Sequence, residues 1–203
     1  MPPVSPGPAF VLLDLDGTLV RMGWDDPALR PGRQRLRQIV AELGLDPPFG
    51  QLVPALAEAG RRLPWVAEAL DDFERSVAER SVACAGLGEL VAALRGVPSA
   101  LVTNNGRPAA LAALARVGLR PEDFGAVIGR EDVTRFKPDP EPLRRAVAAL
   151  RERHGEPGRV LMVGDALTDL EAAAALGPEL PCGVLGVAVL GGIGREADLR
   201  AAG

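Results

Sequence analysis

The sequence is poor in cysteine, since Cys84 and Cys182 are the only two thiols among its 203 residues. Two cysteines so far apart have neither the spacing of a metal site nor the density of a disulfide scaffold. We therefore expect two reduced thiols and a cytoplasmic protein.

Long apolar runs are also lacking. The longest uncharged stretch, Leu180 to Gly194, is shorter than the roughly 18 residues of a membrane-spanning helix and is interrupted by Pro and Gly. The Pro-rich start, residues 1–8, has no basic residue of the kind that opens a secretory signal. We predict that residues 1–8 are disordered and that the protein is soluble.

Excess positive charge is absent as well. The formal net charge is -4, which gives no reason to expect nucleic acid or an anionic membrane as a partner. Of the 23 basic residues, Lys137 is the only lysine. A compact ammonium group differs from a planar guanidinium, so we regard Lys137 as a position where only the former fits.

The apolar residues, which make up 47% of the chain, alternate between two kinds of pattern. Short apolar runs predict buried parallel strands at Ala9–Leu13, Ser99–Val102, Ala126–Ile128, Val160–Val163 and Gly183–Val189. Helical patterns lie between the later ones, at Pro108–Val117, Pro140–His154 and Ala166–Leu176. This alternation predicts an α/β fold with a doubly wound parallel sheet.

One interval breaks the regular spacing. The chain from Asp14 to Thr103 is far longer than the roughly 30 residues of a βαβ unit. Its apolar residues follow helical stripes, including one through Val66, Leu70, Phe73 and Val77. We predict three or four short helices in an inserted module at 21–85, with 9–20 and 86–203 forming the α/β core.

Three of the predicted strands end in polar residues. The first runs into Asp14, the second into Thr103, and the fourth into Asp165. Because the functional crevice of an open parallel sheet lies beyond the carboxyl ends of its strands, we expect these side chains to converge.

The converging residues are suited to phosphoryl chemistry. Asp14 and Asp16 lie two apart at a strand end, and Asp165 and Asp169 lie four apart where a helix begins. Such a dense group of carboxylates requires a cation, and hard oxygen ligands suit Mg²⁺. Thr103, the backbone amides after it and Lys137 then provide donors and positive charge for a phosphoryl group.

In this arrangement Asp14 is the nucleophile and forms an aspartyl-phosphate. Asp16 protonates the leaving oxygen and then activates the water that hydrolyses the intermediate. The expected partner is a small phosphorylated metabolite.

Four segments carry a family resemblance: residues 14–18 (DLDGT), Thr103, Lys137 and residues 164–169 (GDALTD). Their order and spacing resemble the four motifs of the haloacid dehalogenase-like hydrolase superfamily, and the helical insert resembles the C1 cap of its phosphoglycolate phosphatase-like members. The resemblance implies these roles: catalysis by Asp14 and Asp16; phosphate binding by Thr103, Asn104 and Lys137; and metal binding by Asp14, Asp16 (through its carbonyl), Asp165 and Asp169.

Other functions are compatible with parts of this pattern. Asp16 favours phosphoryl transfer over dehalogenation, and the absence of lysine from the insert excludes Schiff-base phosphonate cleavage. A phosphomutase of the same superfamily remains an alternative. From another class, so do a receiver-like signalling domain and a catalytically silent phospho-binding protein.

Overall fold

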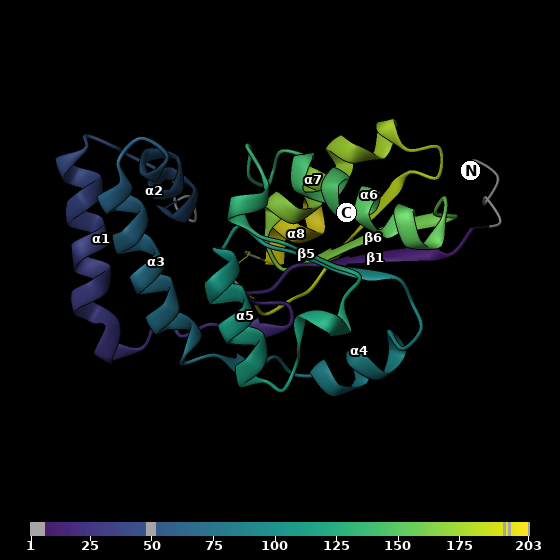
Figure 1. The fold of residues 1–203 in the computed structure, drawn as a ribbon, viewed down its shortest axis with the longest axis horizontal. Coiled ribbons are helices and arrows are strands. Elements are labelled where there is room, and N and C mark those ends of the chain that lie inside the picture. The colour runs from purple at the N-terminus through teal and green to yellow at the C-terminus, as the bar shows by residue number, and fades with distance from the viewer. Residues whose placement is uncertain (1–6, 48–51, 193, 195, 203) are drawn as a thin grey trace.

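The computed structural model describes residues 7–47, 52–192, 194 and 196–202. At its centre five parallel strands lie in the order β5-β4-β1-β6-β7 (Figure 1). These strands are β1 (Ala9–Leu13), β4 (Ser99–Val102), β5 (Ala126–Ile128), β6 (Arg159–Gly164) and β7 (Val184–Ala188). With the first strand in the middle and helices on both faces, the sheet is doubly wound, so the predicted fold class is confirmed.

The observed strands agree closely with the predicted apolar runs. β1, β4 and β5 have the predicted bounds, and β7 is one residue shorter at each end. β6 is one residue longer at each end, because Arg159 pairs with Ala9 and Gly164 pairs with Ala188.

Helices cover the two faces of the sheet. On one face, Phe10 and Leu12 of β1 pack in a core that includes residues of α6 (Glu141–His154) and α7 (Leu167–Leu176). The alternate residue Leu13 packs in a second core with residues of α5 (Arg107–Arg116). Successive side chains of a strand point to opposite faces, which explains why every position of β1 is apolar.

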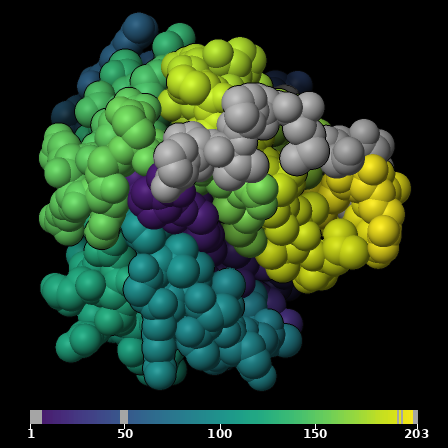
Figure 2. Space-filling view, turned by 90° about the vertical axis from the view of Figure 1, so that its right-hand side faces the viewer, coloured from purple at the N-terminus to yellow at the C-terminus, as the bar shows by residue number. Residues whose placement is uncertain are grey.

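Several short elements lie outside the predicted ones. α4 (Leu87–Ala93) has seven residues, too few for the helical repeat to stand out in the sequence. Figure 2 shows α4 on the lower part of the face at which β1 begins, with the C-terminal segment that includes α8 (Glu196–Ala202) at its right edge. A two-stranded antiparallel ribbon is formed by β2 (Val20–Arg21) and β3 (Val82–Ala83).

The ribbon lies where the chain enters and leaves the segment predicted as a helical insert, residues 21–85. The insert contains α1 (Arg30–Glu42), α2 (Leu52–Gly60) and α3 (Pro64–Ala78), which Figure 1 shows beside the sheet. The apolar stripe predicted through Val66, Leu70, Phe73 and Val77 lies on α3 and is buried. Residues 48–51 lie outside the described residues.

Of the segment predicted to be disordered, residues 1–6 lie outside the described residues. The carbonyl of Pro8 accepts a hydrogen bond from the N–H of Gly158 at 3.0 Å. Within the described part of the chain, no helix is long and apolar enough to cross a membrane.

Candidate active site

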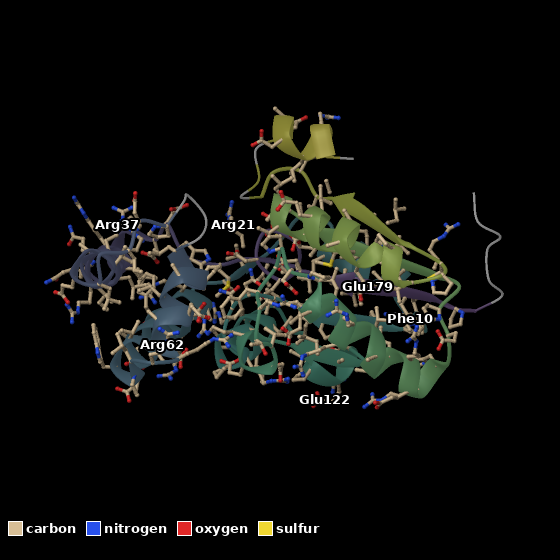
Figure 3. All side chains as sticks on the ribbon, turned by 90° about the horizontal axis from the view of Figure 1, so that it is seen from above. Phe10, Arg21, Arg37, Arg62, Glu122 and Glu179 are labelled. Carbon is tan, nitrogen blue, oxygen red and sulfur yellow. The ribbon has the colours of Figure 1, made fainter. Side chains whose placement is uncertain are left out.

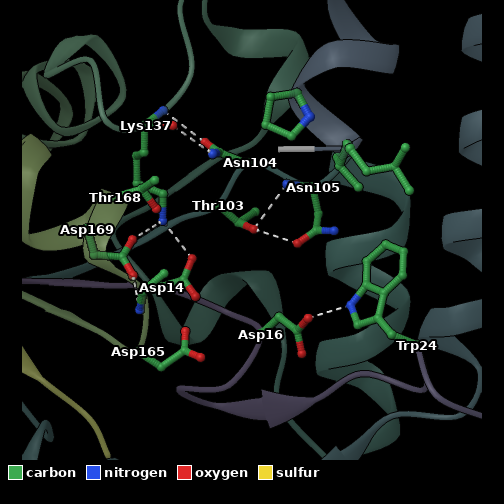
Figure 4. A pocket seen from close by; sticks show the side chains of 14 residues that line it. Asp14, Asp16, Trp24, Thr103, Asn104, Asn105, Lys137, Asp165, Thr168 and Asp169 are labelled. Carbon is green, nitrogen blue, oxygen red and sulfur yellow. Dashed lines mark hydrogen bonds and ion pairs between the residues drawn. The ribbon is translucent and has the colours of Figure 1, made fainter. Parts of the chain in front are cut away.

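The carboxyl ends of the three central strands meet at one cavity of about 240 Å³ (Figure 4). Asp14 follows β1, Thr103 follows β4 and Asp165 follows β6, and all three line it. The register explains the convergence, since Leu13 pairs with both Leu101 and Val163 on the two neighbouring strands. The predicted meeting point of the three strand ends is therefore present.

A cluster of three carboxylates lies at the floor of the cavity. Asp14, Asp165 and Asp169 each place an oxygen within 4.8 Å of the others, and all three side chains are buried. Burial raises the pKa of Asp14 to about 8; Lys137 opposes this rise, whereas Asp169 and Asp165 add to it. The ionised cluster is therefore costly by itself, and a bound cation would offset that cost.

The surroundings of the cluster fit a small hard cation. All three side chains offer oxygen, the ligand type that Mg²⁺ prefers. The carboxylate of Asp165 lies against Gly17 and Gly192, and a Cβ atom at either glycine would overlap it. A Cβ atom at Gly164 would overlap the Asp169 carboxylate in the same way.

Gly192 belongs to a loop between β7 and α8 that the sequence reasoning did not connect with the site. The sequence feature that could have indicated this loop is its three closely spaced glycines, at positions 191, 192 and 194. Only a residue without a side chain leaves room for the Asp165 carboxylate there, so the loop helps to shape the carboxylate cluster.

Lys137 donates all three of its ammonium protons. Its Nζ lies 2.6 Å from Asp14 Oδ1 and 2.6 Å from Asp169 Oδ1 (Figure 4). It also lies 2.9 Å from the Val102 carbonyl. Burial acts to lower the pKa of Lys137, but the two aspartates outweigh it and raise that pKa above its usual value. A compact ammonium with three donors matches three converging acceptors, whereas a planar guanidinium has a different shape.

Asp169 connects the lysine to the start of α7. Its Oδ1 accepts from Lys137, and its Oδ2 accepts from the N–H of Ala166 at 3.1 Å. The side chain therefore satisfies an N–H at the helix N-terminus while it holds the ammonium group beside Asp14.

Asp16 lines the same cavity, but its carboxylate is outside the three-carboxylate cluster. It accepts from the N–H of Met22 at 2.8 Å and from the indole N–H of Trp24. Burial raises the pKa of Asp16, and these two hydrogen bonds partly oppose that rise. A raised pKa suits a side chain that must donate a proton near neutral pH.

The residues after β4 form a hydrogen-bonded loop. The Thr103 hydroxyl donates to Asn105 Oδ1 at 3.0 Å and accepts from the Asn105 N–H at 3.2 Å. The side chain of Asn104 pairs with the main chain of Lys137, since it accepts from the N–H at 3.0 Å and donates to the carbonyl at 3.1 Å. The side chain of Asn104 is therefore occupied by the main chain of Lys137, and phosphate binding by Asn104 stays a prediction.

The helical insert provides the opposite wall of the cavity. That wall consists of Trp24 and of Leu52, Val53 and Pro54 at the start of α2. None of the described arginines of the insert lines the cavity. Figure 3 labels two of them, Arg37 and Arg62. Among the described residues that line the cavity, Lys137 is the sole cationic side chain.

A comparison with known families agrees with the fold. A family model described as haloacid dehalogenase-like hydrolase matches residues 9–177. The chain belongs to this family. The predicted family and the predicted assignment to a hydrolase are thereby confirmed.

Relatives of this haloacid dehalogenase-like hydrolase include two curated enzymes. The chain is 32% identical over 185 residues to the N-acetylmuramic acid 6-phosphate phosphatase of Pseudomonas aeruginosa, covering 82% of this chain and 77% of the relative. It is 32% identical over 187 residues to a plasmid-encoded phosphoglycolate phosphatase of Cupriavidus necator, with the same coverage of 82% and 77%. Among solved structures, a hydrolase from Pseudomonas syringae has the same fold, with a TM-score of 0.67 at 21% identity, covering 95% of this chain and 89% of that one.

Proposed function

We propose that this hydrolase is a phosphomonoesterase that releases phosphate from a small phosphorylated metabolite. The observation that carries the proposal is the pairing of Asp14 with Lys137 in a buried carboxylate cluster, with Asp16 on the same cavity. The phosphatase names of the two curated relatives support it. We also propose that the helical insert acts as a cap over this cavity, with 21–85 as the cap and 9–20 and 86–203 as the core.

The proposed reaction has two steps. In the first, an oxygen of Asp14 attacks phosphorus, the ester P–O bond breaks, and the carboxyl of Asp16 protonates the departing oxygen. In the second, ionised Asp16 takes a proton from water, the water oxygen attacks the aspartyl-phosphate, and inorganic phosphate leaves while Asp14 is restored. Lys137 holds the attacking oxygen in place, and Thr103 with the N–H of Asn104 donates to the phosphoryl oxygens.

The carboxylates of Asp14, Asp165 and Asp169, with the carbonyl of Asp16, form the proposed Mg²⁺ site. When bound, Mg²⁺ would supply positive charge that offsets the repulsion between a carboxylate nucleophile and a phosphate dianion. Lys137, whose ammonium group contacts Asp14, contributes charge of the same sign.

Removal of divalent metal is expected to abolish phosphate release and to lower the melting temperature. The carboxylate cluster repels itself without a cation, and at a free metal concentration of 100 times Kd the bound ion stabilises by about 2.7 kcal/mol. The measurement is phosphate release and thermal denaturation after dialysis against EDTA, with and without added Mg²⁺. Turnover that persists unchanged in EDTA would contradict the metal site.

A panel of phosphate esters tests the reaction itself. Within the panel, 2-hydroxyethyl phosphate and phosphoglycolate differ in whether the leaving group carries a carboxylate. The wall formed by Trp24, Leu52, Val53 and Pro54 offers carbon and no cation, and residues 48–51, next in sequence, contain no basic side chain. A substrate carboxylate placed there would be unpaired. We expect kcat/KM for 2-hydroxyethyl phosphate to exceed that for phosphoglycolate by about tenfold.

Product analysis of the same panel separates the alternatives. Release of inorganic phosphate from at least one ester is the expected result, whereas an isomeric phosphate ester as the sole product would indicate a phosphomutase. If no ester is turned over, the phosphomonoesterase proposal fails. If kcat/KM is higher for phosphoglycolate, the phosphomonoesterase proposal stands and only the expected preference for a neutral leaving group is rejected.

A further inference from the structure

Helix α3 of the insert carries a fully buried carboxylate, Glu74, at the boundary with the core. The Asn105 amide donates to Glu74 Oε1 at 2.9 Å, and the N–H of Gly106 donates to Glu74 Oε2 at 3.1 Å. Both donors belong to the loop that follows β4. A side chain of the insert is thus hydrogen-bonded directly to the loop that contains Thr103.

The contact continues through Asn105 to Thr103. An ionised carboxylate only accepts hydrogen bonds, so Asn105 must turn its NH₂ group toward Glu74 and its oxygen toward Thr103. That oxygen accepts the Thr103 hydroxyl proton at 3.0 Å. Glu74 therefore determines the direction of the Asn105 amide, and the amide determines the direction of the Thr103 hydroxyl.

Gly106 leaves room for the Arg130 guanidinium and the Glu74 carboxylate beside it. Gly106 is the N-cap residue of α5, and a Cβ atom there would lie 2.7 Å from Arg130 Nη2 and 3.2 Å from Glu74 Oε2. A carboxylate beside the first N–H groups of a helix is favourably placed in the field of the helix dipole. The start of α5 and the loop before it are therefore bound to the insert by the same side chain.

Arg130 compensates the buried charge from the core side. Its Nη1 lies 2.8 Å from Glu74 Oε2, and its Nη2 pairs with Asp71, which lies one turn earlier on α3. Burial raises the pKa of Glu74, and Arg130 is the largest opposing influence. An apolar residue could fill such a position without the desolvation cost of an ion pair, so stability alone does not account for the glutamate.

Phe73, the residue before Glu74 on α3, contacts Trp24, which is hydrogen-bonded to Asp16. The ring of Phe73 packs against the indole of Trp24 with centroids 5.9 Å apart, and Trp24 donates to Asp16. One turn of α3 thus contacts partners of both Thr103 and Asp16.

We propose that Glu74 is a positioning residue that couples the docking of the helical insert to the arrangement of the phosphate-binding loop through Asn105. The inference rests on the proposed function of Thr103 and its loop in binding phosphate. The hydrogen bonds of Glu74 exist only while α3 lies against that loop. Thr103 is therefore fully oriented only when the insert is in place.

The test compares two carboxylate-to-amide changes on α3, Glu74→Gln and Asp71→Asn. Both remove the charge of one carboxylate partner of Arg130, but of the two only Glu74 is hydrogen-bonded to the loop after β4. Calorimetric binding of inorganic phosphate to the Mg²⁺-loaded protein is the main measurement, since it requires no turnover. We expect Glu74→Gln to weaken phosphate binding about tenfold, because it leaves a mismatched donor in a buried network, and Asp71→Asn to change it by less than about twofold.

Asn105→Ala provides the second variant. It breaks the link to Thr103 and leaves the Glu74–Arg130 pair intact, so it should weaken phosphate binding about as much as Glu74→Gln. The double variant should be no weaker than either single one, since both interrupt the same chain of contacts.

A lower melting temperature for Glu74→Gln with unchanged phosphate binding would overturn the coupling, as would equal effects of Glu74→Gln and Asp71→Asn. If Glu74→Gln does not fold, unchanged phosphate binding by Asn105→Ala overturns it instead. If wild-type protein binds phosphate but hydrolyses no ester, the proposed function fails, while the comparison between variants still decides the coupling.

Discussion

Replacing Asp14 by Asn is expected to lower kcat for phosphate release by about 10⁴-fold or more. An amide oxygen is a poor nucleophile toward phosphorus, and the amide removes a negative oxygen from the proposed metal site. Lys137 keeps Asp169 and the Val102 carbonyl as acceptors, so the site should stay assembled. The measurement is phosphate release from the best ester of the panel, with Mg²⁺ present.

The stability of Asp14→Asn provides its control. Burial raises the pKa of Asp14 to about 8, above its value in the unfolded chain. The folded state then binds more protons than the unfolded state between about pH 4 and 8, so without metal this carboxyl makes wild-type stability fall as pH rises through that range. Asn has no such titration, so the variant should gain stability relative to wild type as the pH rises.

Thermal denaturation in EDTA from pH 4 to pH 9 checks the sign of this difference. A variant that unfolds at a lower temperature than wild type at every pH would mean that its inactivity reflects damage to the fold. A folded variant with kcat within tenfold of wild type would reject Asp14 as the nucleophile.

Replacing Asp16 by Asn is expected to lower kcat by about 10²- to 10⁴-fold, the usual contribution of general acid–base catalysis. The size of the loss should depend on the leaving group. A p-nitrophenolate ion departs without a proton, whereas an alkoxide needs one. The rate of the first step should therefore fall more with an alkyl phosphate than with p-nitrophenyl phosphate. Stopped-flow and steady-state rates with both esters measure the difference.

The second step gives Asp16→Asn a distinct signature. Without a base to activate water, the variant should release a burst of p-nitrophenol and accumulate phosphorylated Asp14, which mass spectrometry detects. Equal losses with both esters and no phosphorylated protein would contradict the acid–base role.

Trp24→Phe tests the same role of Asp16 without replacing Asp16 itself. It keeps an aromatic ring against Phe73 but removes the indole N–H that donates to Asp16. That hydrogen bond lowers the pKa of Asp16 against the larger effect of burial, so its loss should raise the pKa further. The alkaline limb of the plot of kcat/KM against pH should move to higher pH. A shift to lower pH would contradict the assignment of Asp16 as the general acid.

Much of the fold was predictable because it depends on local patterns. β1, β4 and β5 are continuous apolar runs with polar residues directly after them, and such runs mark buried parallel strands. In a parallel sheet, the ends of neighbouring strands lie together, so Asp14, Thr103 and Asp165 could be placed at one site before any contact was known.

The uses of individual polar side chains were less predictable. Asn104 and Asn105 are adjacent, yet one pairs with the main chain of Lys137 and the other with Glu74. Nothing in the local sequence distinguishes them, because each partner comes from a distant segment. Glu74 itself lies within the apolar stripe of α3, and only the packing of that helix against the core gives it partners.

The amino-acid sequence by itself determined the parallel sheet, the helical insert and the group of aspartates at the strand ends. The spacing of apolar residues and the polar residues that end each strand are properties of short sequence segments. The tertiary structure alone decided which donors meet which acceptors. It brought Lys137 to Asp14 and Asp169, Trp24 to Asp16, and Glu74 to Asn105. Those pairings depend on how the insert and the loops pack in three dimensions, and buried polar groups take the partners that this packing provides.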